Sequence, residues 1–120
     1  MQDTLSSGIS HDRTQTIGTE QSTGHTGTAV LSTPGMIGMM ELACLEAAAP
    51  HLSDGESTVG IHVCVSHVAA AAVGEEVTVS CRLTDVTRRK LTFEVAARVG
   101  DRLLGEGTHK RAVVNMSAFG

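Results

Sequence analysis

The chain has 120 residues, which is enough for one domain with a small core. Nine Lys and Arg residues stand against thirteen Asp and Glu residues, and only 2% of residues are aromatic, so the chain lacks the side chains of a nucleic-acid-binding protein. No apolar run is long enough to cross a membrane, and polar residues follow Met1, so we expect a cytoplasmic protein with neither a membrane nor a nucleic-acid partner.

Residues 1–28 are rich in Gly, Ser, Thr and Gln, and apart from Met1 their only large apolar side chains are Leu5, Ile9 and Ile17. Such a segment buries little surface by itself. We expect residues 1–28 to form a flexible amino-terminal arm, part of which lies over the domain or a partner subunit, and residues 29–120 to form the domain.

The stretch from Gly35 to Ala49 consists mainly of strong helix formers and predicts one long helix. Thr33 can cap this helix, Pro34 suits its first turn and Pro50 ends it. Because the stretch is apolar almost all round, we expect the helix to be buried.

The residues after this helix predict strands. Apolar residues alternate in three rows, and a two-residue turn at Gly100-Asp101 leads into a last strand over residues 102–115, with another tight connection at Arg88-Arg89. The first row runs from Val59 through residues 61, 63 and 65. One buried helix followed by an antiparallel meander gives an α+β class, and a sheet wrapped round a single helix is the hot-dog fold. Because so small a domain covers its sheet poorly, we expect a homodimer.

Two carboxylates on the helix point to chemistry. Glu41 lies within an apolar stripe, and Glu46 lies about 140° further round, so one narrow polar face cannot hold both. At least one is expected in an apolar environment, where a carboxylate becomes a poised base or a strong hydrogen-bond partner. The alternative is a Glu that reaches the surface or pairs with an Arg such as Arg111.

His67 and Thr33 are the other candidates. His67 shares the parity of Val59 and should point toward the helix, whereas His62 should point away, so the two cannot jointly bind a metal. Thr33 stands at a helix amino terminus, where backbone N–H groups can hold an oxyanion. A satisfied core histidine and a simple helix cap are the alternatives. Three cysteines, Cys44, Cys64 and Cys81, are odd in number and widely spaced, which predicts reduced core residues, with no disulfide framework and no metal site.

Three segments in order carry a resemblance to a known family. They read TPGMIGMMELAC from Thr33, GIHVCVSH from Gly60 and GTHKRAV from Gly107, and they resemble the corresponding segments of the fluoroacetyl-CoA thioesterases over roughly residues 31–119. The resemblance implies a hot-dog thioesterase whose catalytic Thr, Glu and His fall on Thr33, Glu41 and His67. It also implies that Gly60 and Arg111 bind substrate.

The resemblance further implies a homodimer with active sites near the subunit interface, with a dimer of dimers as a larger assembly. CoA is part of the substrate, so no further cofactor is expected. That family's enzyme carries bulky aromatic side chains just before its Thr and two residues after it. Here residues 24–32 contain no aromatic residue and Gly35 stands two residues after Thr33, so fluorine selectivity is not implied.

The expected activity is hydrolysis of a short-chain acyl-CoA thioester. Thr33 would approach the acyl carbonyl as nucleophile or position water, His67 would move the proton, and Glu41 would orient or charge the site. Arg111 would pair with Glu41 or touch a CoA phosphate. The alternatives are a hot-dog hydratase or dehydratase acting on acyl thioesters and a non-catalytic acyl-CoA-binding protein.

Overall fold

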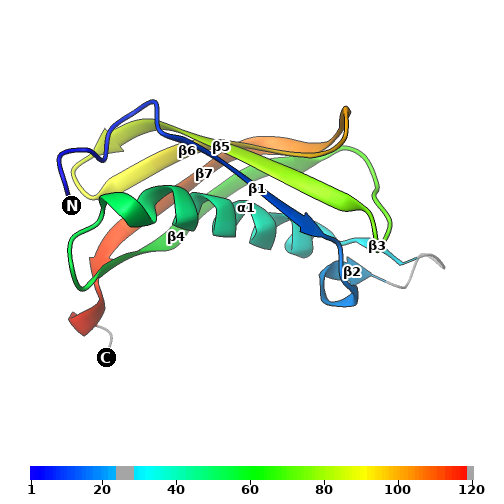
Figure 1. The fold of residues 1–120 in the computed structure, drawn as a ribbon, viewed down its shortest axis with the longest axis horizontal. Coiled ribbons are helices and arrows are strands. Elements are labelled where there is room, and N and C mark those ends of the chain that lie inside the picture. The colour runs from blue at the N-terminus through cyan, green and yellow to red at the C-terminus, as the bar shows by residue number, and fades with distance from the viewer. Residues whose placement is uncertain (24–28, 119–120) are drawn as a thin grey trace.

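One long helix lies across the concave face of a curved antiparallel sheet (Figure 1). The computed structural model describes residues 1–23 and 29–118. Within them, the main sheet has the strand order β1-β5-β6-β7-β4, and β2 and β3 form a separate small pair. The elements are β1 (Ser10–Thr16), η1 (Thr19–Gln21), β2 (Ser22–Thr23), β3 (Val30–Leu31), α1 (Thr33–Ala48), η2 (Ala49–His51), β4 (Glu56–His67), β5 (Glu76–Thr87), β6 (Lys90–Val99), β7 (Arg102–Asn115) and η3 (Met116–Ala118). The predicted α+β class and the single wrapped helix are confirmed.

The helix begins one residue earlier than a Thr33 cap would require. Ser32 is the N-cap, because its backbone is extended and its Oγ accepts a hydrogen bond from the Gly35 N–H at 3.0 Å. Thr33 is the first helical residue, so the prediction that Thr33 caps the helix is wrong. Since Ser32 takes the capping role, the Thr33 hydroxyl is available for another contact.

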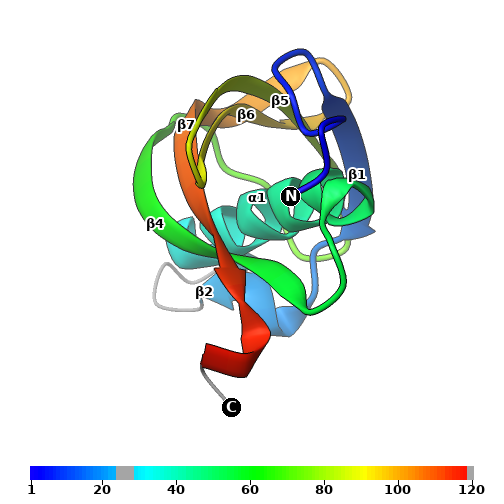
Figure 2. The same cartoon turned by 90° about the vertical axis from the view of Figure 1, so that its left-hand side faces the viewer.

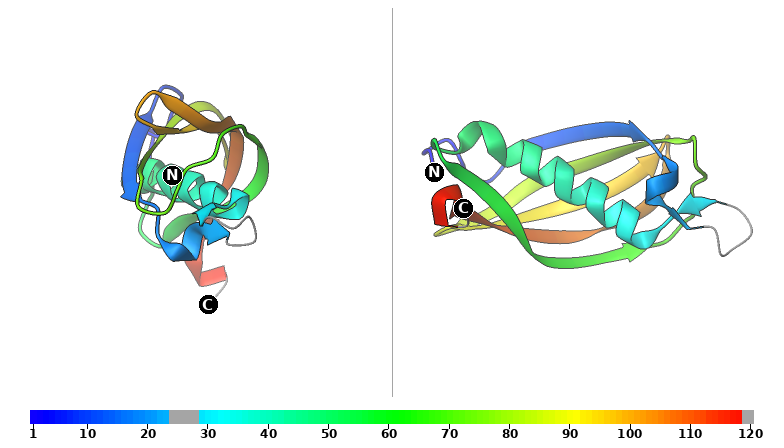
Figure 3. Two further views of the ribbon diagram at one scale, coloured as in Figure 1. Left: turned by 90° about the vertical axis from the view of Figure 1, so that its right-hand side faces the viewer. Right: turned by 90° about the horizontal axis from the view of Figure 1, so that it is seen from below.

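The core lies between the sheet and one face of α1. The sheet curves round the helix when viewed along its axis (Figure 2). The buried helical residues pack mainly against β5 and also against β1, β4 and β6, and Phe93 is the largest fully buried side chain. The expectation of an all-round buried helix is only partly met, because Leu42 is 41% exposed. From below, α1 lies uncovered between β1 and β4, the two edges of the sheet (Figure 3).

The strand connections agree with the sequence except at β4. Both predicted two-residue turns are present: Thr87 pairs with Lys90 across one and Val99 with Arg102 across the other, and residues Arg88 and Gly100 both have a φ of 57°. However, β4 pairs with β7 and not with β5, so the four strands are not a simple meander. The segment between β4 and β5 crosses the end of the molecule, which leaves β4 as an edge strand.

The described part of the expected arm, residues 1–23, is built into the domain. Residues 10–16 form the edge strand β1, which pairs with β5 along its whole length. Leu5 is 5% exposed and Ile17 is 1% exposed, so both belong to the core. The prediction of a flexible arm is therefore wrong for these residues, while residues 24–28 lie outside the described part of the chain. Because backbone hydrogen bonds hold an edge strand, β1 needs no row of apolar side chains, and its polar sequence did not predict a strand.

The apolar row on β4 is broken by a bulge. The register with β7 shifts between Gly60 and His62, so the side chains before and after the shift do not keep one parity. Val59, opposite outward-facing Ala112, and Ile61 are exposed, which contradicts the prediction that one buried face carries the whole row. His67 still points inward, because it lies opposite Gly105, which is buried.

Candidate active site

Thr33 and His67 meet at one end of the molecule. Thr33 opens α1 and His67 ends β4, and the Thr33 Oγ1 lies 2.9 Å from the His67 Nδ1. Thirty-four residues separate the two in sequence. A hydroxyl in hydrogen-bond contact with an imidazole is the arrangement in which a histidine removes a proton from a nucleophile or from a water held beside it.

The second ring nitrogen of His67 has no partner within the described residues. The Nε2 atom is buried and makes no hydrogen bond there. A buried polar atom without a partner costs on the order of 1–3 kcal/mol, so stability alone does not account for an imidazole held in this position. When Nδ1 accepts the Thr33 hydroxyl proton, the ring's own proton is on Nε2.

The amino terminus of α1 offers few free donors. The Gly35 N–H is bound to the Ser32 Oγ, the Met36 N–H is bound to the Ser32 carbonyl at 2.9 Å, and Pro34 has no N–H. The helix start can therefore serve an oxyanion mainly through the Thr33 N–H. The expectation that backbone N–H groups at the helix start hold an oxyanion therefore applies mainly to this one N–H.

Glu41 lies in a second cluster, away from the Thr33–His67 pair. Eight helical residues separate it from Thr33, which is about 12 Å along the axis at 1.5 Å per residue. Its carboxylate lies against Gly60, where a Cβ would come within 2.8 Å of the Glu41 Oε2. Within one chain, therefore, Thr33 and His67 lie in contact, and Glu41 lies apart from them.

Neither helical carboxylate is buried, so the prediction that at least one would be is wrong. The side chains of Glu41 and Glu46 are both 42% exposed. Glu46 accepts hydrogen bonds from His11 and Arg13 of β1, and these contacts lower its pKa, with His11 the main cause. The sequence could not reveal this pairing, because β1 was not anticipated.

Arg111 belongs to the Glu41 cluster and is 5% exposed. Its Nε donates to the Thr58 Oγ1 at 2.7 Å, and its Nη2 donates to the Thr58 carbonyl at 2.8 Å. Its Nη1 lies 3.1 Å from the His109 Nε2 and 3.9 Å from the Glu41 Oε2. Of the two expected roles, this geometry supports the pairing with Glu41, because all three nitrogens face protein atoms. His109 was not singled out from the sequence, although it lies within the GTHKRAV segment.

A shallow hollow, open to solvent, adjoins His67. It encloses about 320 Å³ and is lined by Val30, Leu31, His67, Val68, Ala69 and Ala70. Apart from the imidazole, the described side chains that line it are aliphatic and carry no charge. A short acyl chain fits such a surface better than a charged group does.

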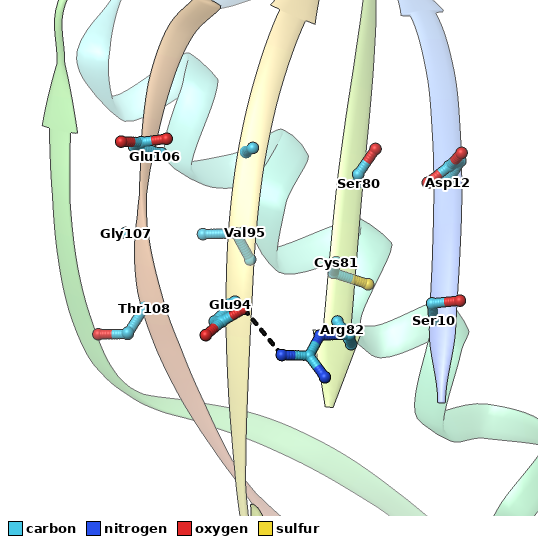
Figure 4. Close-up of a pocket in the computed structure, with 11 residues that line it drawn as sticks. Ser10, Asp12, Ser80, Cys81, Arg82, Glu94, Val95, Glu106, Gly107 and Thr108 are labelled. Carbon is cyan, nitrogen blue, oxygen red and sulfur yellow. Dashed lines mark hydrogen bonds and ion pairs between the residues drawn. The ribbon is translucent and has the colours of Figure 1, made fainter. Parts of the chain in front are cut away.

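A larger hollow lies elsewhere, on the face of the sheet away from α1, and has a volume of about 540 Å³ (Figure 4). Its outward side chains are mostly polar, and Arg82 and Glu94 form an ion pair across neighbouring strands at 3.3 Å. None of the predicted site residues lines it. We therefore assign the candidate site to the Thr33–His67 end despite the smaller hollow there.

Within residues 1–23 and 29–118, no group of three or more His, Cys, Asp and Glu side chains is arranged to hold a metal ion. None of the described helices is long and apolar enough to cross a membrane. Cys44 and Cys81 are buried, whereas Cys64 is exposed on β4, which corrects the expectation that all three are core residues.

Comparisons with known proteins show the family to which the chain belongs. A family model described as a fluoroacetyl-CoA-specific thioesterase matches residues 10–117. The fluoroacetyl-CoA thioesterase of Streptantibioticus cattleyicolor is 43% identical over 90 residues, which make up 75% of this chain and 65% of that protein. The match thus spans slightly less than two thirds of the relative's length.

Solved structures extend the likeness to the fold. The fluoroacetyl-CoA thioesterase FlK superposes with a TM-score of 0.89 at 33% identity, covering 96% of this chain and 92% of that chain. A variant of FlK in complex with fluoroacetate and CoA superposes with a TM-score of 0.88 at 33% identity, covering 97% and 100% of the two chains. A thioesterase superfamily member from Thermus thermophilus has a TM-score of 0.84 at 24% identity, covers 94% of this chain and 86% of its own, and shares the hot-dog fold.

Proposed function

Because the chain belongs to the fluoroacetyl-CoA-specific thioesterase family, we propose that it is an enzyme that hydrolyses a short-chain acyl-CoA thioester to the free acid and CoA. The observation that carries this proposal is the 2.9 Å contact between the Thr33 hydroxyl and the His67 imidazole beside an aliphatic hollow. CoA is the leaving group of the reaction, and the proposal requires no additional cofactor.

The proposed reaction uses Thr33 and His67 in two ways that share one geometry. In the first, the Thr33 oxygen attacks the acyl carbon while His67 takes its proton, the carbon–sulfur bond breaks, and the thiolate of CoA receives that proton. Water then cleaves the acyl-threonine ester. In the second, Thr33 holds a water molecule whose oxygen attacks the acyl carbon while His67 takes a proton from it; the carbon–sulfur bond then breaks, and the thiolate of CoA receives that proton. Both routes consume one thioester and one water and release one acid and one thiol.

In this proposal, Glu41 of one subunit faces the Thr33–His67 pair of a second subunit, which requires a dimer. The free edge of β4 carries exposed Val59, Ile61 and Val63, which are between 40% and 46% exposed, an unusual run for an edge strand facing water. We propose that β4 pairs antiparallel with β4 of a second copy to form a homodimer. Association of two such dimers is a further proposal and follows only from the family resemblance.

The pairing has a favoured register. Residues that lie opposite each other on antiparallel strands point to the same face, so inward Val63 must lie opposite an inward residue. A two-fold axis near Cys64 meets this condition and, because of the bulge, brings Gly60 opposite His67 of the partner subunit. Glu41, which lies against Gly60, would then face the Thr33–His67 pair of the other chain. The three catalytic residues would meet across the dimer.

Thiol cross-linking tests this register. Cys64 is the exposed cysteine, whereas Cys44 and Cys81 are buried. A short bis-maleimide should join two native chains through Cys64 with high yield, and Cys64→Ser should abolish the product. A protein that remains monomeric during sedimentation at micromolar concentration, or a dimer that never cross-links, would contradict the proposed register.

Two rival functions make different predictions. A hydratase or dehydratase would hydrate an enoyl-CoA without releasing thiol, and a binding protein would bind an acyl-CoA without either reaction. The Thr33–His67 contact favours hydrolysis, because neither rival needs a hydroxyl against the imidazole. A cytoplasmic location remains a prediction from the sequence.

The test is a panel of acetyl-, propionyl-, butyryl- and fluoroacetyl-CoA, with released thiol followed by a colorimetric reagent. Wild type should release thiol from at least one of these esters. Thr33→Ala, His67→Ala and Glu41→Gln should each lower kcat/KM by at least about tenfold. Hydration of crotonyl-CoA without thiol release, or calorimetric binding of acyl-CoA without turnover, would replace the proposal with one of its rivals.

A further inference from the structure

His109 is a buried histidine with no role in the mechanism above. It lies on the inner face of β7 and is 1% exposed. Its Nδ1 is 2.8 Å from the backbone carbonyl oxygen of His62, and its Nε2 is 3.1 Å from the Nη1 of Arg111. Both ring nitrogens are therefore occupied by the protein.

The partners of His109 determine where its proton lies. A carbonyl oxygen only accepts hydrogen bonds and a guanidinium only donates them. The Nδ1 must therefore carry the proton, and the Nε2 must accept from Arg111, so the neutral Nδ1–H tautomer alone satisfies both contacts. Burial, and secondarily the charge of Arg111, lower the pKa of His109, which agrees with a neutral ring.

Together, Thr58 and His109 hold all three nitrogens of the Arg111 guanidinium. Thr58 binds the Nε and the Nη2 through its hydroxyl and its carbonyl. The Nη1 is the third guanidinium nitrogen, and it lies 3.9 Å from the Glu41 Oε2. His109 supplies the hydrogen-bond acceptor at this nitrogen, and the bulge beside His62 lies next to the carbonyl that orients the ring.

We propose that His109 is a positioning residue that accepts a hydrogen bond from Arg111 and thereby holds the guanidinium beside the Glu41 carboxylate at Gly60. Its effect on turnover rests on the proposed function, because it acts through Glu41. Its tautomer and its contact with Arg111 do not depend on that function.

The tautomer is tested by NMR on uniformly ¹⁵N-labelled protein at neutral pH. Long-range correlations between ring nitrogens and ring protons show which nitrogen carries the proton, and the His109 signals are assigned by their loss in His109→Gln. The proposal predicts a neutral Nδ1–H ring. A neutral Nε2–H ring or an imidazolium would overturn the proposal whatever the enzyme's activity.

Two conservative variants separate positioning from packing. In His109→Asn the amide nitrogen can replace the Nδ1 donor, but no acceptor is left for Arg111. In His109→Gln the amide oxygen can replace the Nε2 acceptor, but the donor to the His62 carbonyl is lost. Each variant removes one hydrogen bond of the buried ring, so similar losses of stability are expected from both.

Their kinetics should differ. His109→Asn is expected to lower kcat/KM by at least about tenfold, mainly through kcat, because the carboxylate loses its orientation. His109→Gln is expected to recover most of that loss. Equal activity in the two variants, or activity that follows thermal stability alone, would overturn the proposal.

A double-mutant cycle identifies the route of the effect. If His109 acts through Arg111, then His109→Asn added to Arg111→Lys should cost much less than it does in wild type. Additive losses would overturn the proposal. If wild type releases no thiol from any ester, the proposed function fails, and the NMR result still decides the placement of His109 independently.

Discussion

Gly60→Ala tests whether the position of the Glu41 carboxylate controls turnover. A Cβ at Gly60 would lie 2.8 Å from the Glu41 Oε2, 3.2 Å from the His109 Cε1 and 3.5 Å from the Arg111 Nη1. Ordinary contacts begin at about 3.4 Å, so the carboxylate must retreat by about 0.6 Å, which is the difference between 3.4 and 2.8 Å. The backbone at Gly60 is not among the positive-φ glycines, so the added methyl group causes no backbone strain.

The methyl group should damage activity more than stability. Glu41 is 42% exposed and can move toward solvent, and the buried His109 ring has to shift by only about 0.2 Å, the difference between 3.4 and 3.2 Å. We therefore expect the free energy of unfolding to change by less than about 1 kcal/mol and Tm by less than about 5 °C. Misplacement of a catalytic group by about 1 Å can cost up to about a hundredfold in rate. We therefore expect kcat/KM to fall by at least about tenfold.

Gly38→Ala is the matched control. Gly38 lies within α1, and a Cβ there would meet nothing within 4 Å. The substitution should raise stability by about 0.5–1 kcal/mol, because Ala favours the helix, and it should leave kcat/KM unchanged. The assay is thiol release over a range of acyl-CoA concentrations, together with thermal unfolding. Wild-type kcat/KM in Gly60→Ala would refute the claim that the placement of Glu41 matters.

Three further predictions concern other elements. Ser32→Ala removes the helix cap and should cost about 1 kcal/mol in chemical unfolding, whereas Thr33→Ser should keep both stability and turnover; a stable Ser32→Ala protein would contradict the cap assignment. Hydrogen bonds from the Met1 ammonium, the Ser53 N–H and Arg89 lower the pKa of Glu56 from 4.5 to about 2. Because the pKa of Glu56 is lower in the folded state than in the unfolded state, ionised Glu56 stabilises the fold. This stabilisation is complete above about pH 4.5 and is lost as pH falls toward 2. Urea unfolding measured at each pH should show no such loss in Glu56→Gln. Ile61→Lys places a charge on the free edge of β4 and should shift the sedimentation coefficient toward that of a monomer, while an unchanged dimer would argue for a different interface.

The sequence predicted the helix and the three strands that follow the crossover because their apolar residues keep regular spacing. Residues Val77 and Phe93 are buried as the alternation requires. The strand β1 was missed because its side chains are polar on both faces and its contribution is mainly backbone pairing with β5. Edge position, and not apolar character, made it a strand.

The candidate site was predictable only in part. Thr33 and His67 do meet, although no local pattern fixes the approach of a helix start to the end of a strand thirty-four residues away. The separation of Glu41 from them could not be foreseen, because it depends on the length of α1 and on the bulge that places Gly60 against the carboxylate. His109 gave no signal of its own, since its role depends on a carbonyl and a guanidinium contributed by two strands.

The most direct test of the central claim is a double-mutant cycle of Thr33→Ala and His67→Ala, measured as kcat/KM for thioester hydrolysis. If the hydroxyl and the imidazole act as one unit, the double variant should be no slower than the slower single variant, and each single variant should be slower than wild type by at least about tenfold. Losses that simply multiply, or single variants that turn over at the wild-type rate, would contradict the account.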